Sequence, residues 1–194
     1  MRKEILAGLI ALGIAIVVIA LAVILWFVAV NNRLVALQEN VQSAWGQVDT
    51  VLQRRYDLIP NLVNTVKGYA KHEKSLLEDV TRLRSQWAAA GTVNEKAQAA
   101  NQLEGELSRL LLVVERYPDL KANQNFRDLQ YELAGTENRI AVERQRYNDA
   151  VRTYNTAIRQ FPASVVAGMR GFTDKTYFEA APAAKEAPKV DFGA

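Results

Sequence analysis

An unbroken apolar run close to the N-terminus constrains this chain more than any other feature. Residues 5–30 contain no charged residue and no Asn, Gln, Ser, Thr or Pro. The hydrocarbon layer of a bilayer is about 30 Å thick, and a helix of about 20 residues crosses it. Because a lipid-exposed segment must satisfy its own backbone hydrogen bonds, a single segment of this kind is helical. The sequence therefore predicts a short flank at residues 1–4 and a transmembrane helix at residues 5–30 that contacts the lipid bilayer.

A cleaved secretory signal is the alternative for this run. Ala20 and Ala22 resemble a cleavage triplet, and Arg2 and Lys3 suit the start of a signal. However, the apolar core of a signal is usually about 7–15 residues long, and this run continues to Val30. We therefore expect an anchor that stays attached.

Flanking charges predict the orientation of the anchor. Arg2, Lys3 and the α-amino group precede it, whereas Arg33 is the only basic residue among the first twenty that follow. The positive-inside rule then places the N-terminus in the cytoplasm and the remainder outside it. The margin is one or two charges, so a reversed topology stays open. Small residues recur every four positions on the anchor, which leaves a homo-oligomer open as well.

Composition narrows the function classes of the rest of the chain. Basic and acidic residues are interspersed, and the net charge is +3. No basic block suited to a phosphate backbone occurs, so we expect no nucleic-acid partner. The chain has no cysteine, which excludes disulfides and thiolate metal sites.

Four amphipathic segments follow the anchor, each with apolar residues three or four positions apart. The first runs from Leu34 and continues the anchor helix. The second carries residues 62–87, the third opens at a Thr92–Glu95 capping box, and the fourth extends from Leu120 to about Gln160. Such stripes cannot be buried singly. We expect an all-α fold, with an antiparallel four-helix bundle at residues 31–161.

The first and second segments meet at a short punctuated stretch, residues 57–60. Arg54 and Arg55 suit a helix C-terminus, Asp57 can cap the next helix, and Pro60 fits a first turn. We predict a break here, with a kinked continuous helix as the alternative.

The last part of the chain, residues 162–194, differs in character. Large apolar residues alternate with Gly and Pro. We expect an extended segment that packs partly on the bundle and is loosest at residues 179–189.

The sequence carries no complete motif for catalysis, cofactor binding or metal binding. His72-Glu73 begins like a zinc-protease helix, but Leu76 stands where the second histidine is needed. A chain with one histidine cannot supply paired Glu-x-x-His motifs for a di-iron site. No nucleophile turn or Gly-rich phosphate loop occurs. We therefore predict no catalytic, cofactor-binding or metal-ligating residue, no cofactor, and a protein that is not an enzyme.

Polar residues within or beside the apolar stripes are more informative. A charge inside a bundle must be paired, because an unpaired one costs several kcal/mol. These residues either fix helix register inside the chain or contact a partner. The candidates are Arg54, Arg55, Asp57, Asn61, Glu137, Arg139, Glu143, Arg144, Asn148 and Asn155. The last two belong to a heptad repeat, residues 146–152 and 153–159, which we interpret as a packing seam, with a partner-binding strip as the alternative.

Several long motifs resemble the LemA family. They are Ala44-Trp45-Gly46-Gln47-Val48-Asp49, residues 54–63, Val66-Lys67-Gly68-Tyr69-Ala70, His72-Glu73, Thr136-Glu137-Asn138-Arg139-Ile140, Arg146-Tyr147-Asn148, Tyr154-Asn155, Phe161-Pro162, Gly171-Phe172 and Tyr177-Phe178-Glu179. The chain departs from the family at Asn31-Asn32, where Tyr-Asn is common.

The resemblance implies a bacterial, single-pass protein of the inner membrane with a bundle of long helices, and it supplies no reaction. Relatives among magnetosome proteins and neighbouring protease genes imply envelope assembly or quality control. We expect a non-enzymatic scaffold or adaptor that contacts an unidentified membrane or envelope protein. The alternative is a receptor-like transducer with a ligand between bundle helices, near Arg55, Glu137 or Arg144.

Overall fold

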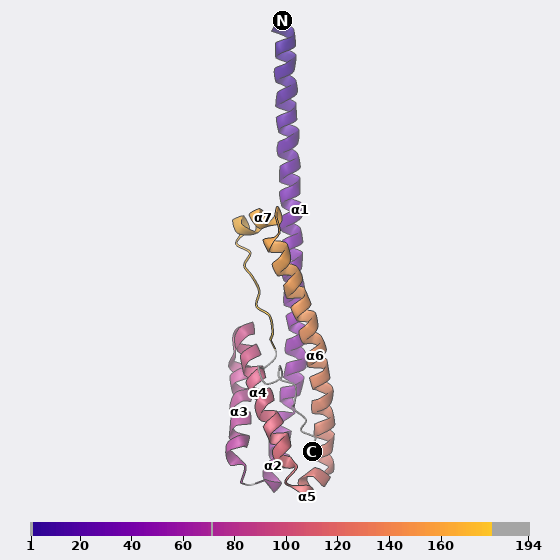
Figure 1. Cartoon of the computed structure of the whole chain (residues 1–194), viewed down its shortest axis with the longest axis vertical. Helices are drawn as coiled ribbons and strands as arrows, with labels where there is room; N and C mark the ends of the chain where they lie inside the picture. The colour runs from indigo at the N-terminus through magenta and orange to yellow at the C-terminus, as the bar shows by residue number, and fades with distance from the viewer. Residues whose placement is uncertain (1, 71, 180–194) are drawn as a thin grey trace, which may run out of the picture. The chain divides into compact units, whose positions relative to one another are not determined.

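The computed structural model describes residues 2–70 and 72–179, with residues 2–7 described by their backbone alone. Within that part of the chain every regular element is a helix (Figure 1). The predicted all-α fold is confirmed. The helices are α1 (Arg2–Asp57), α2 (Ile59–Tyr69), α3 (Lys74–Ala89), α4 (Val93–Val114), α5 (Pro118–Ala122), α6 (Gln124–Arg159) and α7 (Ala163–Arg170).

The chain forms two compact units, and α1 and α6 contribute to both. The first unit comprises Met1–Gln42 and Ala150–Lys175. The second unit comprises Ser43–Asp149 and Thr176–Ala194. Each unit is built around its own buried apolar residues.

The second unit contains the helical bundle. Figure 1 shows α3 and α4 side by side, joined by a short turn. At the end of the bundle, α2 packs against α3, α5 packs against α4, and α2 and α5 contact each other. Its fully buried large side chains are Val48, Leu52, Tyr56, Ile59, Leu62, Leu103, Leu107, Leu110, Leu120 and Phe126. These are residues of the predicted apolar stripes, with Ile59 and Leu120 added at the two turns.

The predicted break at residues 57–60 is a kink. Leu58 alone separates α1 from α2, its backbone stays right-handed helical, and the Leu62 N–H donates to the Leu58 carbonyl over 3.0 Å. Pro60 lies in the first turn of α2, where a missing N–H costs little. The chain does not turn back at residues 57–60. It does so after α2, between Tyr69 and Lys74, so the second predicted helix is divided into α2 and α3 (Figure 1).

One further boundary differs from prediction, and another is confirmed. The capping box is present, because Thr92 Oγ1 accepts the Glu95 N–H and the Glu95 carboxylate accepts the Thr92 N–H. The fourth predicted helix is divided into α5 and α6 at Asn123, whose side-chain oxygen accepts the Phe126 N–H. This side chain competes with helix continuation by satisfying an N-terminal donor of α6.

Residues 163–170 form helix α7, where an extended segment was expected. The helix ends at Gly171, whose φ of 73° is the left-handed conformation that glycine adopts without steric cost. Residues 172–179 then run without regular secondary structure, and we call them the strap. The expected loose stretch, apart from Glu179, and the apolar residues Val190 and Phe192 lie outside the described residues.

Candidate functional site

The apolar stretch of α1 is open to its surroundings along its described length. Its large side chains from Leu9 to Leu25 are each at least 55% exposed. This helix is the one element of the described chain that is long and apolar enough to cross a membrane. A soluble protein would bury such a surface, so the stretch requires an apolar solvent.

The centre of the second unit holds a buried charge, Arg55. Its side chain is 4% exposed. Nη2 donates to Glu104 Oε2 over 2.8 Å, and Nε lies 2.7 Å from Glu104 Oε1. Nη1 donates to the Leu133 carbonyl and to Thr136 Oγ1. Only Nη2 forms a charge-assisted hydrogen bond with Glu104, because Nε and Oε1 are close enough for an ion pair but have no hydrogen-bond partner among the described residues.

Three helices therefore meet at Arg55. It comes from α1, Glu104 comes from α4, and Leu133 and Thr136 come from α6. Burial raises the pKa of Glu104, and the neighbouring Arg55 opposes that shift. Glu137 lies farther out, with its carboxylate 3.7 Å from Arg55 Nη2. That these contacts fix the relative register of the three helices stays a prediction.

The structure brings two of the sequence candidates, Arg55 and Glu137, to one place. Sequence reasoning missed Glu104 and Thr136, which complete the cluster. Glu104 directly follows Leu103 in a buried stripe, so the signal was a charge adjoining the stripe on α4.

Four other candidates lie on the surface of the second unit. Arg54 pairs with Glu132 at 3.6 Å, and both side chains are more than half exposed. Asp57 accepts from Gln53 and lies 3.7 Å from Arg84. The remaining exposed candidates are Asn61 and Arg139. Such surface contacts contribute little to stability.

The next group of candidates holds the strap within the second unit. The Asn148 side chain donates to the Phe178 carbonyl and accepts the Phe178 N–H, at 3.0 and 2.9 Å. Tyr147 Oη donates to the Thr176 carbonyl over 2.8 Å. Trp45 packs edge-on against both Tyr147 and Phe178. The strap thus satisfies its own backbone groups through side chains of α6.

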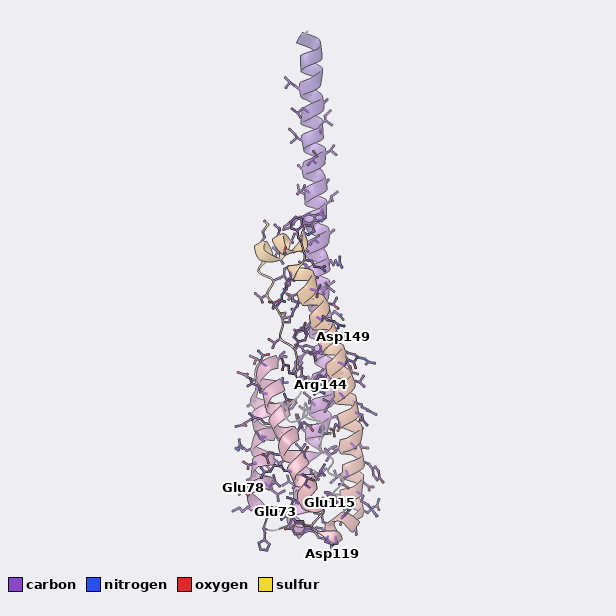
Figure 2. All side chains as sticks on the ribbon, viewed as in Figure 1. Glu73, Glu78, Glu115, Asp119, Arg144 and Asp149 are labelled. Carbon is purple, nitrogen blue, oxygen red and sulfur yellow. The ribbon has the colours of Figure 1, made fainter. Side chains whose placement is uncertain are left out.

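Neighbouring charges complete this region of α6. Arg144, which is labelled in Figure 2, lies over the Phe178 ring at 5.8 Å. Glu143 pairs with Arg146 at 2.7 Å along the same helix.

The same contacts recur in the first unit. The Asn155 side chain donates to the Lys175 carbonyl and accepts the Lys175 N–H, both at 2.8 Å. Tyr154 Oη donates to the Thr173 carbonyl over 3.1 Å. Burial raises the pKa of Tyr154 and of Tyr147, which keeps both hydroxyls protonated as donors.

Helix geometry explains why a heptad repeat on α6 matches the strap. Seven helical residues rise about 10.5 Å, and three residues of extended chain span about 10 Å. Asn155 binds residue 175 and Asn148 binds residue 178, three positions later. The heptad repeat that we interpreted as a packing seam buries its tyrosines and uses its asparagines on the chain's own strap.

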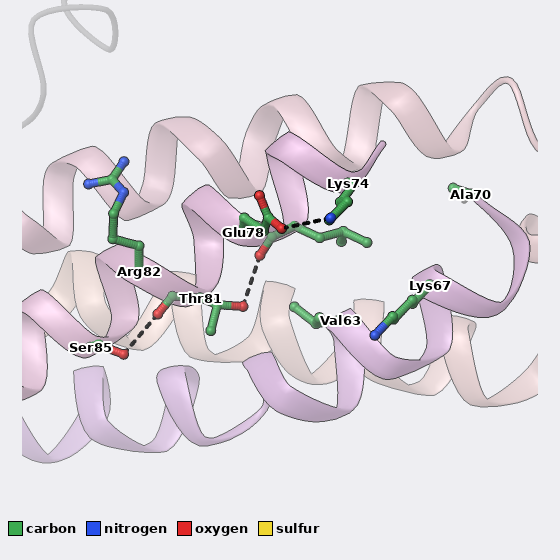
Figure 3. A pocket seen from close by; sticks show the side chains of 9 residues that line it. Val63, Lys67, Ala70, Lys74, Glu78, Thr81, Arg82 and Ser85 are labelled. Carbon is green, nitrogen blue, oxygen red and sulfur yellow. Dashed lines mark hydrogen bonds and ion pairs between the residues drawn. The ribbon is translucent and has the colours of Figure 1, made fainter. Parts of the chain in front are cut away.

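A cavity of about 610 Å³ lies between α2 and α3 (Figure 3). Its lining residues are Val63, Lys67, Ala70, Lys74, Leu77, Glu78, Thr81, Arg82 and Ser85. Figure 3 shows Lys74 paired with Glu78, and Thr81 and Ser85 each bonded within α3. None of the residues at the Arg55 cluster lines this cavity.

Acidic side chains also gather at the turns that close the bundle. Figure 2 labels Glu73, Glu115 and Asp119 there. Glu73 pairs with Arg116 at 3.0 Å, and Glu115 pairs with Lys121. Within the described residues no group of His, Cys, Asp or Glu is arranged to hold a metal ion.

Comparison with known proteins places the chain. It is 27% identical over 199 residues to the magnetosome proteins MamQ 2 and MamQ 1 of Paramagnetospirillum magneticum, covering 87% of this chain and 73% of each relative. It is 23% identical over 155 residues to Protein LemA of Metamycoplasma hominis, covering 79% of this chain and 71% of that protein. The sequence model of the LemA family matches residues 44–192. The apolar stretch of α1 marks a membrane-associated protein, and the match over most of its length identifies which kind: the chain belongs to the LemA family.

Proposed function

We propose that this protein is a single-pass, membrane-anchored scaffold or adaptor that works by binding other proteins of the bacterial envelope. The observation that carries the proposal is the Arg55 cluster. Arg55 is the charged residue buried most deeply in the described bundle, and its donors bind partners of the same chain. A side chain so engaged stabilises the bundle and is not free for substrate or ligand. Other molecules are then bound by exposed residues on the surface of the protein.

The continuity of α1 supports an anchored body. The helix runs from Arg2 to Asp57 without interruption, from the apolar stretch into the second unit. The bundle therefore follows the anchor along one helix, without an intervening loop. Such a connection suits a protein that works at a membrane surface.

The relatives favour a role in assembly. Two of them are named as magnetosome proteins. A magnetosome is a subcellular structure, so a protein of that name is more readily understood as a component than as a metabolic enzyme. We extend this to envelope assembly or quality control for the present chain.

A receptor-like transducer is supported less well. It requires a ligand site between bundle helices beside Arg55, Glu137 or Arg144. The cavity between α2 and α3 is lined by other residues, and Arg55 already binds Glu104.

We further propose an inner-membrane location with the N-terminus in the cytoplasm and the bundle outside it. The charges of Arg2 and Lys3 support this orientation. Protease treatment of cells with a permeabilised outer layer tests it. The bundle should be digested while a tag at the N-terminus survives. Survival of the bundle until the inner membrane is broken would reverse the orientation.

In-cell photocrosslinking tests the scaffold role. A photoreactive residue replaces Tyr131, which is 77% exposed on α6, and in a second variant Ser85, which lines the α2–α3 cavity. Buried Leu103 serves as the matched control position. We expect a defined envelope protein, identified by mass spectrometry, from at least one surface position and none from Leu103. Recovery of uncrosslinked monomer alone from both surface positions, in several growth conditions, would contradict the proposal.

A further inference from the structure

A group of exposed apolar side chains surrounds helix α7 in the first unit. Phe161, which precedes the helix, is 84% exposed, Met169 is 71% exposed and Val165 is 52% exposed. Val165 and Met169 are four positions apart and therefore lie on one face of α7. Val166 and Ala167 are buried on another face. The helix is thus fastened to its unit through one face and leaves a second apolar face uncovered.

Helix α7 lies against α1 where the apolar stretch ends. Arg170, the last residue of α7, donates from Nε to Asn31 Oδ1 over 3.0 Å. Asn31 is the first polar residue after the apolar run. Figure 1 shows α7 beside α1 at this level, and α7 and the part of α1 up to Gln42 both belong to the first unit.

This position identifies what covers the exposed face. If residues 8–30 occupy the hydrocarbon of a bilayer, the boundary between hydrocarbon and headgroups falls near Asn31. Any group in hydrogen-bond contact with Asn31 then lies at that boundary as well. The apolar face of α7 therefore belongs to a helix that is held beside the end of the lipid-facing stretch of α1.

The side chains of the first unit suit that boundary. Arg33 and Arg170 are exposed beside the apolar group and can reach lipid phosphates while their stems stay in a less polar layer. Helices that lie in the interface insert an apolar face about 5–10 Å into the boundary region and keep basic residues on the polar side.

We infer that Phe161 and α7 form a second membrane contact, in which Phe161, Val165 and Met169 insert into the phospholipid headgroup boundary beside the exit of α1. This contact rests on the membrane anchoring by α1. It fixes the first unit at the lipid surface by two elements instead of one.

Spin labelling of the full chain in phospholipid vesicles tests the inference. The chain has no cysteine, so single substitutions Phe161→Cys, Val165→Cys and Met169→Cys each provide one labelling site. Leu112→Cys is the matched control, because Leu112 is 72% exposed, close to the 71% of Met169, but lies on α4 of the second unit. Val17→Cys marks the lipid environment of the anchor. The vesicles contain phosphatidylcholine and phosphatidylglycerol.

The readout is the accessibility of each label to oxygen, which concentrates in lipid, and to a water-soluble nickel complex. We expect the oxygen-to-nickel ratio at residues 161, 165 and 169 to exceed that at residue 112 severalfold and to stay below that at residue 17, which lies deeper in the bilayer. A ratio equal to that at residue 112, with residue 17 still in lipid, would overturn the inference and leave the anchor intact. Labels shielded from both reagents would mean that a protein or a second copy covers α7, which also overturns it. A water-exposed label at residue 17 would overturn the anchoring itself and the inference with it.

Discussion

Two arginine–carboxylate pairs with similar contact distances lie in very different surroundings. In the second unit, Arg55 meets Glu104 through Nε and Nη2, and the side chains are 4% and 30% exposed. In the first unit, Arg159 meets Asp174 through the same two nitrogens, and the side chains are 67% and 51% exposed. Contacts of 2.7–3.0 Å join the atoms in both pairs.

Their carboxyl groups nevertheless shift in opposite directions. Burial raises the pKa of Glu104 despite the adjacent Arg55. The hydrogen bonds from Arg159 lower the pKa of Asp174, which stays in water. The comparison teaches that removal from water, more than the distance between the charges, decides what an ion pair contributes. The buried pair specifies how three helices meet, and the exposed pair secures the strap at low cost.

Removing one partner should separate the two pairs most clearly. Arg55→Ala leaves Glu104 without a counter-charge inside the bundle, and we expect a loss of about 3–5 kcal/mol in the free energy of unfolding. Arg159→Ala is the matched variant and should leave the urea midpoint almost unchanged. Urea unfolding in mild detergent, followed by circular dichroism, measures both. Equal losses from the two variants would end the distinction.

Replacing both buried partners sharpens the same point. In Arg55→Met/Glu104→Leu no unpaired charge remains, and apolar side chains of similar length fill the site. We expect most of the stability lost in Arg55→Ala to return, because a buried pair is often no better than a well-packed apolar one. Additive losses in a double-mutant cycle would show instead that the attraction itself is the main contribution.

A third test compares a buried neutral contact with an exposed charged one on the strap. Asn155→Ala removes two hydrogen bonds to the Lys175 backbone, which should lower the free energy of local opening by about 1–3 kcal/mol. Trypsin should then cleave after Lys175 roughly tenfold faster or more, as mapped by mass spectrometry. Asp174→Asn, which breaks only the exposed pair, should have a much smaller effect. Faster cleavage in Asp174→Asn than in Asn155→Ala would show that the exposed ion pair is what holds the strap.

The two carboxyl groups predict opposite pH dependence. Glu104 has a folded-state pKa above its unfolded value of about 4.3, so its favourable contribution is complete below that value and is lost as pH rises through the folded pKa. Asp174 has a lowered pKa, so its contribution is present above about 3.9 and is lost as pH falls through the folded pKa. Urea midpoints of Glu104→Gln and Asp174→Asn against the parent chain, from pH 3 upwards, should diverge in opposite senses. Parallel curves would contradict these shifts.

The smallest effect is expected beside the buried pair. Tyr56 is fully buried, and its hydroxyl has no hydrogen-bond partner in the described part of the chain. Tyr56→Phe should therefore change the free energy of unfolding by less than about 1 kcal/mol, and the melting temperature should stay unchanged or rise slightly. Tyr147→Phe is the control, because its hydroxyl donates to the Thr176 carbonyl, and it should lower the melting temperature. A clear loss in Tyr56→Phe would imply that this hydroxyl has a partner.

Local signals account for the parts of the fold that the sequence predicted. The apolar run, the helical stripes and the Thr92–Glu95 capping box depend on residues close together in the chain, and all three are confirmed. The choice between a hairpin and a kink at Pro60 is different. A proline in a first turn is compatible with both, and packing of Ile59 and Leu62 in the bundle decides between them.

The candidate site was predictable only in part. Arg55 and Glu137 were candidates because they lie beside or within apolar stripes, but Glu104 adjoins its stripe and resembled a solvated residue. Helix α7 is too short for a periodic pattern to distinguish it from an extended segment. The asparagines of the heptad repeat suggested polar contacts, but no pattern in α6 reveals that their partner is the backbone of residues 173–178.

That backbone partnership has a consequence for how the strap tolerates change. The Tyr and Asn side chains of α6 grip carbonyl and amide groups that every amino acid except proline possesses. The side chains of residues 173 and 176 are consequently interchangeable as far as these hydrogen bonds are concerned, whereas Lys175 also lies over the Tyr154 ring. Residues 173 and 176 could be substituted to introduce a tag or a new recognition motif, while the side chains of α6 keep their hydrogen bonds to the same backbone.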